Sequence, residues 1–436
     1  MAGSIPPASG QGARFGRKKG QRKKPRKPRS NAGNSVPSGS AGKTQPPASR
    51  GGGGKIDATA VMPPASAPEA VITPVLATAP TAEPEGPATW QKPLSPLRHA
   101  PHYRQAYAAI DLGTNNCRLL IARPSGEHFV VIDAFSRVVR LGEGLAQTGH
   151  LSDAAMDRAL AALHVCAEKL RKRNVHLARS VATEACRRAT NGQAFIDRVL
   201  EETGIHLNII TAQEEARLAV LGCHILLEQG TGPAMIFDIG GGSTEMVLVE
   251  TGETVPRILD WQSVPWGVVS LTESIGAIAD DPQARAAAYA EMRRRVDDGF
   301  ADFCERVSPM RNAARGEGRI RLLGTSGTVT TLASVHLELP QYDRRAVDGL
   351  VVPADSMRHI SRRLATMTPA ERIALPCIGR ERSDLVVAGC AILESIIDIW
   401  PADRLGIADR GIREGILRSL MAIGADPRSP KRTEAA

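Results

Sequence analysis

Apolar and polar residues alternate in blocks from about residue 106 onward, and these blocks predict strands and helices in turn. Apolar runs at Tyr107–Asp111 and Arg118–Ala122, separated by a short polar segment, predict two strands joined by a turn. Ser152 and Asp153 offer an N-cap for an amphipathic helix that continues to about Lys172. Further strands are predicted at 180–182, 206–210, 234–238, 246–249 and 320–323, a helix at 213–228, and a turn at 324–328 that leads into another helix. Strands that alternate with helices indicate an α/β fold.

The strand, turn, strand pattern occurs twice. Residues 110–113 (Ile-Asp-Leu-Gly) align with residues 237–240 (Phe-Asp-Ile-Gly) at an offset of 127, and each segment is followed by four polar or small residues and a second strand. A repeat at this distance indicates a duplicated domain. If the two copies face each other, their Asp-Gly turns lie across one cleft.

Composition separates the two ends of the chain from its middle. Residues 1–105 are rich in Pro, Gly and Ala and have too little apolar surface to offset the entropy of ordering, so we expect a disordered tail, with a second one at 426–436. The first 103 residues hold 15 Lys or Arg against four Asp or Glu, although the whole chain is only +9. Such a block favours contact with RNA or another polyanion, and a merely solubilising extension fits equally well.

Two features predict the compartment. No apolar run approaches the roughly 20 residues of a membrane span, so we expect no contact with a membrane. The seven cysteines are far apart and never form a CxxC pair. Such usage is typical of a reducing cytoplasm and argues against a structural metal site.

Three consecutive glycines between two strong strands indicate a close approach, because glycine weakens a strand. The N–H groups of Gly240, Gly241 and Gly242 could converge on an anion, and the hydroxyls of Ser243 and Thr244 would add donors. The twin turn supplies a second set of candidate phosphate-binding residues, namely Gly113, Thr114 and Asn115. An ordinary glycine hairpin is the alternative.

Acidic residues stand beside both turns. Asp111 and Asp238 end their strands, and they would repel a phosphate unless a hard cation lay between; Mg²⁺, which binds one or two carboxylates together with substrate oxygens, answers this. Glu245 begins the strand after the second turn and is a third candidate, acting through water. A carboxylate that merely faces solvent is the alternative for Glu245.

Two further pairs of charged residues are candidates. Glu214 and Glu215 lie where a strand gives way to a helix, and their side chains point about 100° apart, so only one can face a given cleft. An acid at this place could also simply favour the helix N-terminus. Arg187 and Arg188 could bind phosphate through their guanidinium groups, although an arginine pair is more often surface charge.

Taken together, these segments resemble the exopolyphosphatase and guanosine pentaphosphate phosphohydrolase family, whose fold belongs with actin, Hsp70 and the sugar kinases. The resemblance covers residues 108–420. It is carried, in order, by AIDLGTNNCRLLIA, RVVRLGEGL, ATEACRRA, IITAQEEARL, FDIGGGSTEMVLV, LLGTSGTVTTLA, RSDLVVAGCAILESI and LGIADRGIREGIL.

The resemblance implies two ribonuclease-H-like lobes, at residues 106–233 and 234–425, with the active site between them. It implies that Glu215 is the catalytic base, that Arg187 binds phosphate, and that Arg140 in RLGEGL contributes to the substrate channel. It further implies that both glycine turns hold phosphates, and that Asp111, Asp238 and Glu245 occupy the positions associated with the metal. Homodimers are common in the family, although the sequence itself does not give the oligomeric state.

The sequence departs from the family pattern in three places. ATEACRRA lacks the Asn-Thr variant seen in many members, although its arginine is kept. Asn116 stands where a serine usually follows the asparagine, so a hydroxyl is missing there. Longer members carry a C-terminal helical domain with a His-Asp pair, which this sequence does not contain, so we expect a short-form enzyme.

The resulting hypothesis is the hydrolysis of a terminal phosphoanhydride bond in polyphosphate or pppGpp, with polyphosphate favoured by the basic tail. Glu215 would deprotonate the attacking water, while amides, Arg187 and Mg²⁺ stabilise the transferring group. Two alternatives stay open: a phosphotransferase of the same fold, and a non-catalytic sensor of polyphosphate or an alarmone that reaches RNA through its tail.

Overall fold

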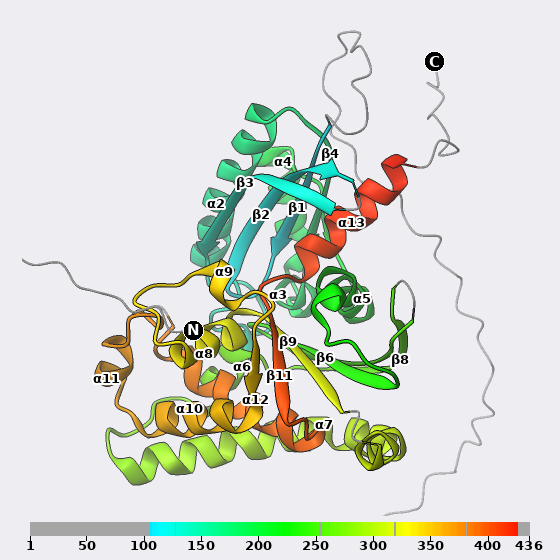
Figure 1. The fold of residues 1–436 in the computed structure, drawn as a ribbon. Coiled ribbons are helices and arrows are strands. Elements are labelled where there is room, and N and C mark those ends of the chain that lie inside the picture. Colours follow the sequence, from blue (N-terminus) through cyan, green and yellow to red (C-terminus); the bar gives the residue numbers. More distant parts are fainter. Residues whose placement is uncertain (1–104, 127, 253–254, 318–319, 381, 426–436) are drawn as a thin grey trace, which may run out of the picture. The chain divides into compact units, whose positions relative to one another are not determined.

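The protein is described by a computed structural model that covers residues 105–126, 128–252, 255–317, 320–380 and 382–425. The two predicted disordered tails lie outside the described residues, apart from Gln105. Within the described ranges, two β-sheets form, each with helices packed on it (Figure 1).

The first sheet has five strands in the order β3-β2-β1-β4-β5. Strand β1 lies in the middle, antiparallel to β2 and parallel to β4. The strand bounds are β1 Ala106–Leu112, β2 Asn116–Ser125, β3 His128–Val138, β4 Val175–Ala182 and β5 Leu207–Ile209.

The second sheet has six strands in the order β10-β11-β9-β6-β7-β8. Its bounds are β6 Pro233–Ile239, β7 Thr244–Glu250, β8 Arg257–Val264, β9 Arg321–Thr325, β10 Val351–Pro353 and β11 Arg404–Ala408. Without the edge strand β10, this order repeats that of the first sheet: a three-stranded antiparallel meander followed by two parallel strands. The duplication predicted from the sequence is therefore confirmed in the topology.

The predicted hairpins form the centre of this repeat. Strands β1 and β2 pair so that Asp111 faces Arg118, and strands β6 and β7 pair so that Asp238 faces Glu245. The third strand of each meander, β3 and β8, was not predicted. Charged and polar residues interrupt the apolar positions of both strands, and most of their side chains are exposed or only half-buried.

The helices of the first half cover α1 Leu145–Thr148, α2 Asp153–Lys172, α3 Glu184–Arg188, α4 Gly192–Thr203 and α5 Ala212–Cys223, followed by the 3₁₀ turn η2 His224–Leu226. Helix α2 confirms its prediction, including the N-cap, because the Ser152 hydroxyl accepts a hydrogen bond from the Ala155 amide. Helix α5 ends at Cys223, five residues before its predicted end at 228. The chain tightens at His224 so that Leu226 and Leu227 can pack with the buried side chains of the second sheet.

The helices of the second half cover α6 Val268–Ile275, α7 Pro282–Gly316, α8 Gly327–His336, α9 Arg344–Val347, α10 Ala354–Thr366, α11 Pro369–Ile373, α12 Leu385–Ile399 and α13 Ile412–Ala425. Helix α12 is the most apolar of these and packs its buried side chains into the core of the second sheet. The predicted turn at 324–328 was too long. Gly324 and Thr325 continue strand β9, and the chain turns at Ser326 alone, whose φ is 103°.

Helices α5 and α13 cross at a close approach. A Cβ at Gly222 would meet the Gly411 carbonyl oxygen, and a Cβ at Gly415 would meet the Leu218 carbonyl oxygen, so both glycines are required by sterics. Helix α13 also packs on strands β1, β2 and β4 of the first sheet, where Ile416, Leu417 and Leu420 are buried. The lobe boundaries at 106–233 and 234–425 stay a prediction.

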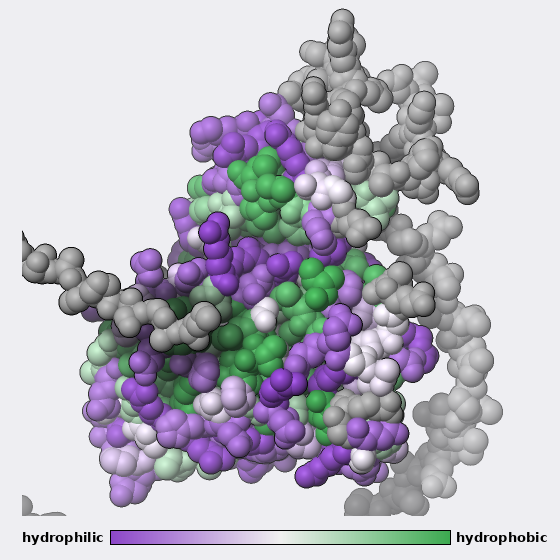
Figure 2. Space-filling view, in the orientation of Figure 1, coloured by the Kyte–Doolittle hydropathy of each residue, from purple (hydrophilic) through white to green (hydrophobic). Residues whose placement is uncertain are grey.

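The surface shown in Figure 2 is mainly hydrophilic, with hydrophobic residues gathered in the middle of the view. Among the described residues no helix is long and apolar enough to cross a membrane.

Candidate active site

A cleft of about 970 Å³, including space open to solvent, lies where the two hairpin turns meet. Both predicted turns line it, together with Glu215 from α5 and the segment between β9 and α8. The cleft therefore brings together most of the residues that the sequence singled out. Those that line it are Asp111, Gly113, Thr114, Asn115, Glu215, Asp238, Gly240, Gly241, Gly242, Ser243 and Glu245.

The two turns have the same backbone geometry. The Gly113 amide donates to the Asn116 carbonyl at 2.9 Å, and the Gly240 amide donates to the Ser243 carbonyl at 2.9 Å. These bonds close each turn. The amide of Gly240 is therefore not available to an anion, which corrects the expectation that all three glycine amides converge on phosphate.

Gly241 and Gly242 bring the second turn into contact with the first. A Cβ at Gly242 would lie 2.6 Å from the Thr114 hydroxyl and 2.9 Å from Glu184 Cγ. A Cβ at Gly241 would lie 3.0 Å from the Thr114 Cβ. Packing of one turn on the other thus explains the run of glycines. The sequence of one turn alone does not reveal this packing.

Four amides at this contact have no acceptor in the described part of the chain, namely those of Thr114, Asn115, Gly241 and Gly242. Adjacent free amides of this kind form an anion-binding concavity. Both turns thus retain donors for a phosphate.

The hydroxyls of the second turn have protein acceptors. The Ser243 hydroxyl donates to Glu245 Oε1 at 2.7 Å, and the Thr244 hydroxyl donates to the Trp266 carbonyl at 2.7 Å. Thr244 is fully buried and does not line the cleft. Both hydroxyls therefore donate to protein groups in this structure, whereas the sequence predicted them as donors to phosphate.

Asp111 and Asp238 both line the cleft, and the negative charge of Asp111 acts on the carboxyl group of Asp238. Burial raises the pKa of Asp111, and Arg118 opposes this shift. Burial raises the pKa of Asp238 to about 6, with Arg118 lowering it and Asp111 raising it further. Both half-buried carboxylates line the cleft with partly uncompensated charge, and a cation bound there would relieve both.

Glu245 is buried at 2% exposure, so the solvent-facing alternative is wrong. Its Oε1 accepts from the hydroxyls of Ser243 and Ser263, at 2.7 and 2.9 Å. Burial, followed by the charge of Asp238, raises the pKa of Glu245 to about 7.

The residues present fit a hard divalent cation in a specific way. Among the described residues, no three of His, Cys, Asp and Glu converge as a metal cage. Asp111 and Asp238, both with raised pKa values, line an open cleft. This donor set fits a hard divalent cation that is held by one or two carboxylates and completes its shell with water and substrate oxygens.

The structure separates the two adjacent glutamates. Glu215 is 7% exposed and lines the cleft. Glu214 points elsewhere, because its carboxylate accepts from Arg179 at 2.8 Å and from Arg217 at 2.7 Å. Burial and the charge of Glu245 raise the pKa of Glu215 well above its usual value, and Arg187 lowers it.

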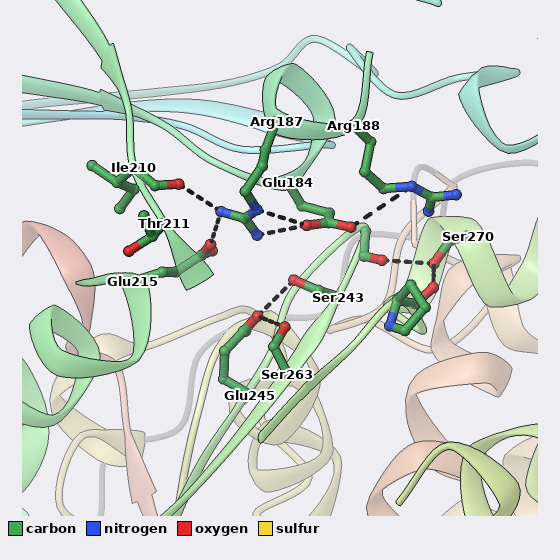
Figure 3. A network of polar contacts seen from close by, with 12 residues as sticks. Glu184, Arg187, Arg188, Ile210, Thr211, Glu215, Ser243, Glu245, Ser263 and Ser270 are labelled. Atoms are coloured by element: carbon green, nitrogen blue, oxygen red, sulfur yellow. Dashed lines mark hydrogen bonds and ion pairs between the residues drawn. The ribbon is translucent and has the colours of Figure 1, made fainter. Parts of the chain in front are cut away.

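Arg187 holds Glu215 in place (Figure 3). Its Nη1 donates to Glu215 Oε2 at 3.1 Å and to the Ile210 carbonyl at 2.8 Å, while its Nε and Nη2 donate to Glu184. The two carboxylates raise the pKa of Arg187 against the effect of burial. Arg187 does not itself line the cleft, so a phosphate would have to displace these contacts to reach it.

Arg140 is not brought to the cleft. Its side chain is exposed and its φ is 48°, while its amide and that of Val139 donate to the Asn115 carbonyl. The backbone at Arg140 thus stabilises the first turn through the carbonyl of Asn115.

Three charged residues that line the cleft were not predicted as site residues from the sequence: Arg118, Glu184 and Arg382. The repeat offset places Arg118 at the position of Glu245, a signal that could have identified it. Glu184 lies within the segment already noted for Arg187. Arg382 is brought in only by the tertiary fold, where its Nη1 donates to the Thr331 hydroxyl at 2.9 Å.

Known proteins are similar to this chain in sequence and in fold. Exopolyphosphatase 2 of Mycobacterium tuberculosis is 32% identical over 328 residues, which cover 72% of this chain and 98% of that protein. The crystal structure of the Aquifex aeolicus member of the Ppx/GppA family is 25% identical, with a TM-score of 0.59 over 74% of this chain and 99% of that one. An exopolyphosphatase structure from Cytophaga hutchinsonii, at 23% identity and a TM-score of 0.64 over 73% and 98% of the two chains, shares the fold. The actin-like α/β fold predicted from the sequence is thereby confirmed. Residues 120–423 match the Ppx/GppA phosphatase family, and the chain belongs to it.

Proposed function

We propose that this phosphatase hydrolyses the terminal phosphoanhydride bond of inorganic polyphosphate, and that pppGpp is a second substrate. The observation that carries the proposal is the buried carboxylate of Glu215, which is held by Arg187 at the edge of a cleft lined by free backbone amides. A carboxylate with a raised pKa is a stronger base, and it is suited to taking a proton from water near neutral pH.

In the proposed reaction, Glu215 takes a proton from a water molecule while that oxygen forms a bond to the terminal phosphorus. The bridging P–O bond breaks, and the shortened chain leaves with the bridging oxygen. The amides of Thr114, Asn115, Gly241 and Gly242 donate to the oxygens of the transferring group, whose charge is the main target of catalysis in phosphoryl transfer.

Asp111 and Asp238 are the residues that would hold Mg²⁺, and Glu245 would contact it through water. The ion would supply positive charge to the phosphate oxygens. Arg187 acts as a positioning residue for Glu215, because its guanidinium is engaged by two carboxylates and a carbonyl.

The proposed compartment is the cytoplasm, because all seven cysteines are free thiols. A homodimer, and a contact between the basic segment before residue 104 and RNA or another polyanion, are also part of the proposal. That segment lies outside the described residues.

The test is a side-by-side assay of phosphate release from long polyphosphate, pppGpp and ATP, with and without Mg²⁺. We expect Mg²⁺-dependent release of orthophosphate, fastest from polyphosphate. Addition of ADP addresses the phosphotransferase alternative, since a kinase makes ATP where a hydrolase makes orthophosphate. Formation of ATP without orthophosphate, or binding without any turnover, would overturn the proposal in favour of the kinase or the sensor.

A further inference from the structure

The second glycine turn is held from behind by helix α6. The Val268 amide donates to the Gly240 carbonyl at 3.0 Å, and the Val269 amide donates to the Gly241 carbonyl at 2.8 Å. A trans peptide group points its C=O and its N–H in opposite directions. The amides of Gly241 and Gly242 therefore point away from the helix, toward the cleft that both glycines line.

The contact between α6 and this turn also affects the strength of the turn's donors. The N-terminus of a helix carries partial positive charge, and hydrogen bonds in a chain polarise one another, so α6 makes the two glycine amides stronger donors to an anion. The approach is close, because a Cβ at Gly267 would lie 2.4 Å from the Gly241 carbonyl carbon. The Ser270 hydroxyl of α6 lies 2.9 Å from the Gly242 carbonyl oxygen (Figure 3).

The first turn is held in the same way by the segment that follows strand β3. The Gly142 amide donates to the Thr114 carbonyl at 2.9 Å, so the Asn115 amide, which belongs to the same peptide group, points away from that segment. The Asn115 carbonyl accepts from the amides of Val139 and Arg140, at 2.8 and 3.0 Å. Each turn therefore has its own support, one from each half of the chain.

Glu273 joins the two supports. It lies on α6, and its Oε1 accepts a hydrogen bond from the Gly144 amide at 3.0 Å. Gly144 follows the residues that hold the first turn and is the N-cap of helix α1. Glu273 Oε2 is buried and makes no hydrogen bond within the described part of the chain, so the carboxylate is anchored through Oε1. One side chain of the second half is thus bonded to the support of the first turn.

We propose that Glu273 is a positioning residue, which keeps the free amides of the two turns aligned so that they converge on one phosphoryl group. The inference rests on the proposed function for the identity of that group. Without the bond to Gly144, the support of the first turn is free to shift relative to α6, and a misplacement near 1 Å can cost about 10²-fold in rate. Glu273 does not line the cleft, so it acts through the turns and not on the substrate.

Three substitutions separate this role from a loss of folding. Glu273→Ala removes the acceptor, whereas Glu273→Gln keeps an oxygen that can accept from the Gly144 amide. Glu305→Ala is a matched control, because Glu305 is exposed on the neighbouring helix α7 and makes no hydrogen bond or ion pair with the described residues. Melting temperatures of the full-length proteins set an assay temperature well below the unfolding of every variant.

The first measurement is amide hydrogen exchange of the protein without substrate. Exchange of the Val139, Arg140 and Gly142 amides reports on the support of the first turn. Glu273→Ala should speed their exchange about tenfold, the effect of losing one hydrogen bond to a charged group. Glu273→Gln and Glu305→Ala should exchange like the wild type. Unchanged exchange in Glu273→Ala would overturn the proposal, whether or not the protein hydrolyses polyphosphate.

The second measurement is steady-state phosphate release from polyphosphate with Mg²⁺. Glu273→Ala should lower kcat about tenfold and change KM by less than about threefold, because the converging amides act most strongly on the charge of the transition state. Glu273→Gln should recover most of the lost kcat. A rise in KM with kcat unchanged, or no recovery in Glu273→Gln, would contradict the positioning role. A wild type that releases no phosphate would refute the proposed function alone, because the exchange of the three amides still tests the link between the supports.

Discussion

The hairpins β1–β2 and β6–β7 share one backbone plan, yet they differ in the residue opposite their aspartate. Arg118 faces Asp111 across the first hairpin, whereas Glu245 faces Asp238 across the second. Opposite charges in such a pair stabilise a sheet and like charges destabilise it. The second hairpin therefore carries an electrostatic cost that the first does not, and the cost falls inside the candidate active-site cleft.

This difference indicates that the two turns have different roles in the site. The first turn supplies an acid whose charge Arg118 partly compensates, and a wall against which the second turn packs. The second supplies the excess negative charge, with the pKa of Asp238 near 6 and that of Glu245 near 7. A bound cation would relieve the second turn more than the first.

The largest expected effect comes from removing the two aspartate charges in turn. Asp238→Asn should lower kcat/KM by about 10²-fold or more, because charge stabilisation by a metal is worth several kcal/mol. Asp111→Asn should cost less, because Arg118 already compensates that charge. A Mg²⁺ titration of phosphate release measures both. Equal losses, or a greater loss for Asp111→Asn, would refute the asymmetry.

The next effect comes from a Cβ placed on each turn. Gly242→Ala would push against Thr114 and Glu184, and a misplacement near 1 Å typically costs about 10²-fold in rate. Gly113→Ala meets its nearest atom, the Asn116 carbonyl oxygen, at 3.6 Å and should retain activity within a few-fold. Steady-state kinetics of the pair checks this, and an inactive Gly113→Ala with an active Gly242→Ala would reverse the roles of the turns.

A smaller effect is expected for the arginine beside the base. Arg187→Gln should reduce activity at neutral pH about tenfold, roughly one pKa unit of lost interaction with Glu215. Arg187 lowers the pKa of Glu215, so its removal raises that pKa and moves the acidic limb of the pH–rate profile to higher pH. Arg188→Gln is the control, since its Nε lies 3.8 Å from Glu184 and its side chain is 39% exposed. An unmoved acidic limb would contradict the positioning role.

The smallest effect concerns stability. The pKa of Glu245 is raised from 4.5 to about 7, so the folded state binds a proton there that the unfolded state releases. The stabilisation is complete below about pH 4.5 and is lost as pH rises through 7. In EDTA, the melting temperature of the wild type should fall by a few degrees more between pH 5 and pH 8 than that of Glu245→Gln. Parallel curves would show that Glu245 does not titrate in this range.

Much of this molecule could be predicted from its sequence. The paired strands, the repeat and helix α2 follow from apolar periodicity and capping, which are local signals. Strands β3 and β8 were missed because charged and polar residues interrupt their apolar positions. Helix α5 was predicted too long because nothing local marks the turn at His224.

The sequence predicted which residues line the site better than it predicted the contacts between them. Glu215 could be preferred over Glu214 only through a family resemblance, since both residues look alike to local physics. The engagement of Thr244 by Trp266 and the packing of Gly242 on Thr114 depend on segments far apart in the sequence. The sequence pattern of a single strand cannot predict contacts of this kind.

Glu215→Gln tests the central claim most directly, with Glu214→Gln as its isosteric neighbour. The kcat for phosphate release from polyphosphate should fall by at least about 10²-fold in Glu215→Gln, the usual contribution of a positioned base. Its affinity for polyphosphate in EDTA should stay close to that of the wild type, and Glu214→Gln should turn over normally. Normal turnover by Glu215→Gln would contradict the account.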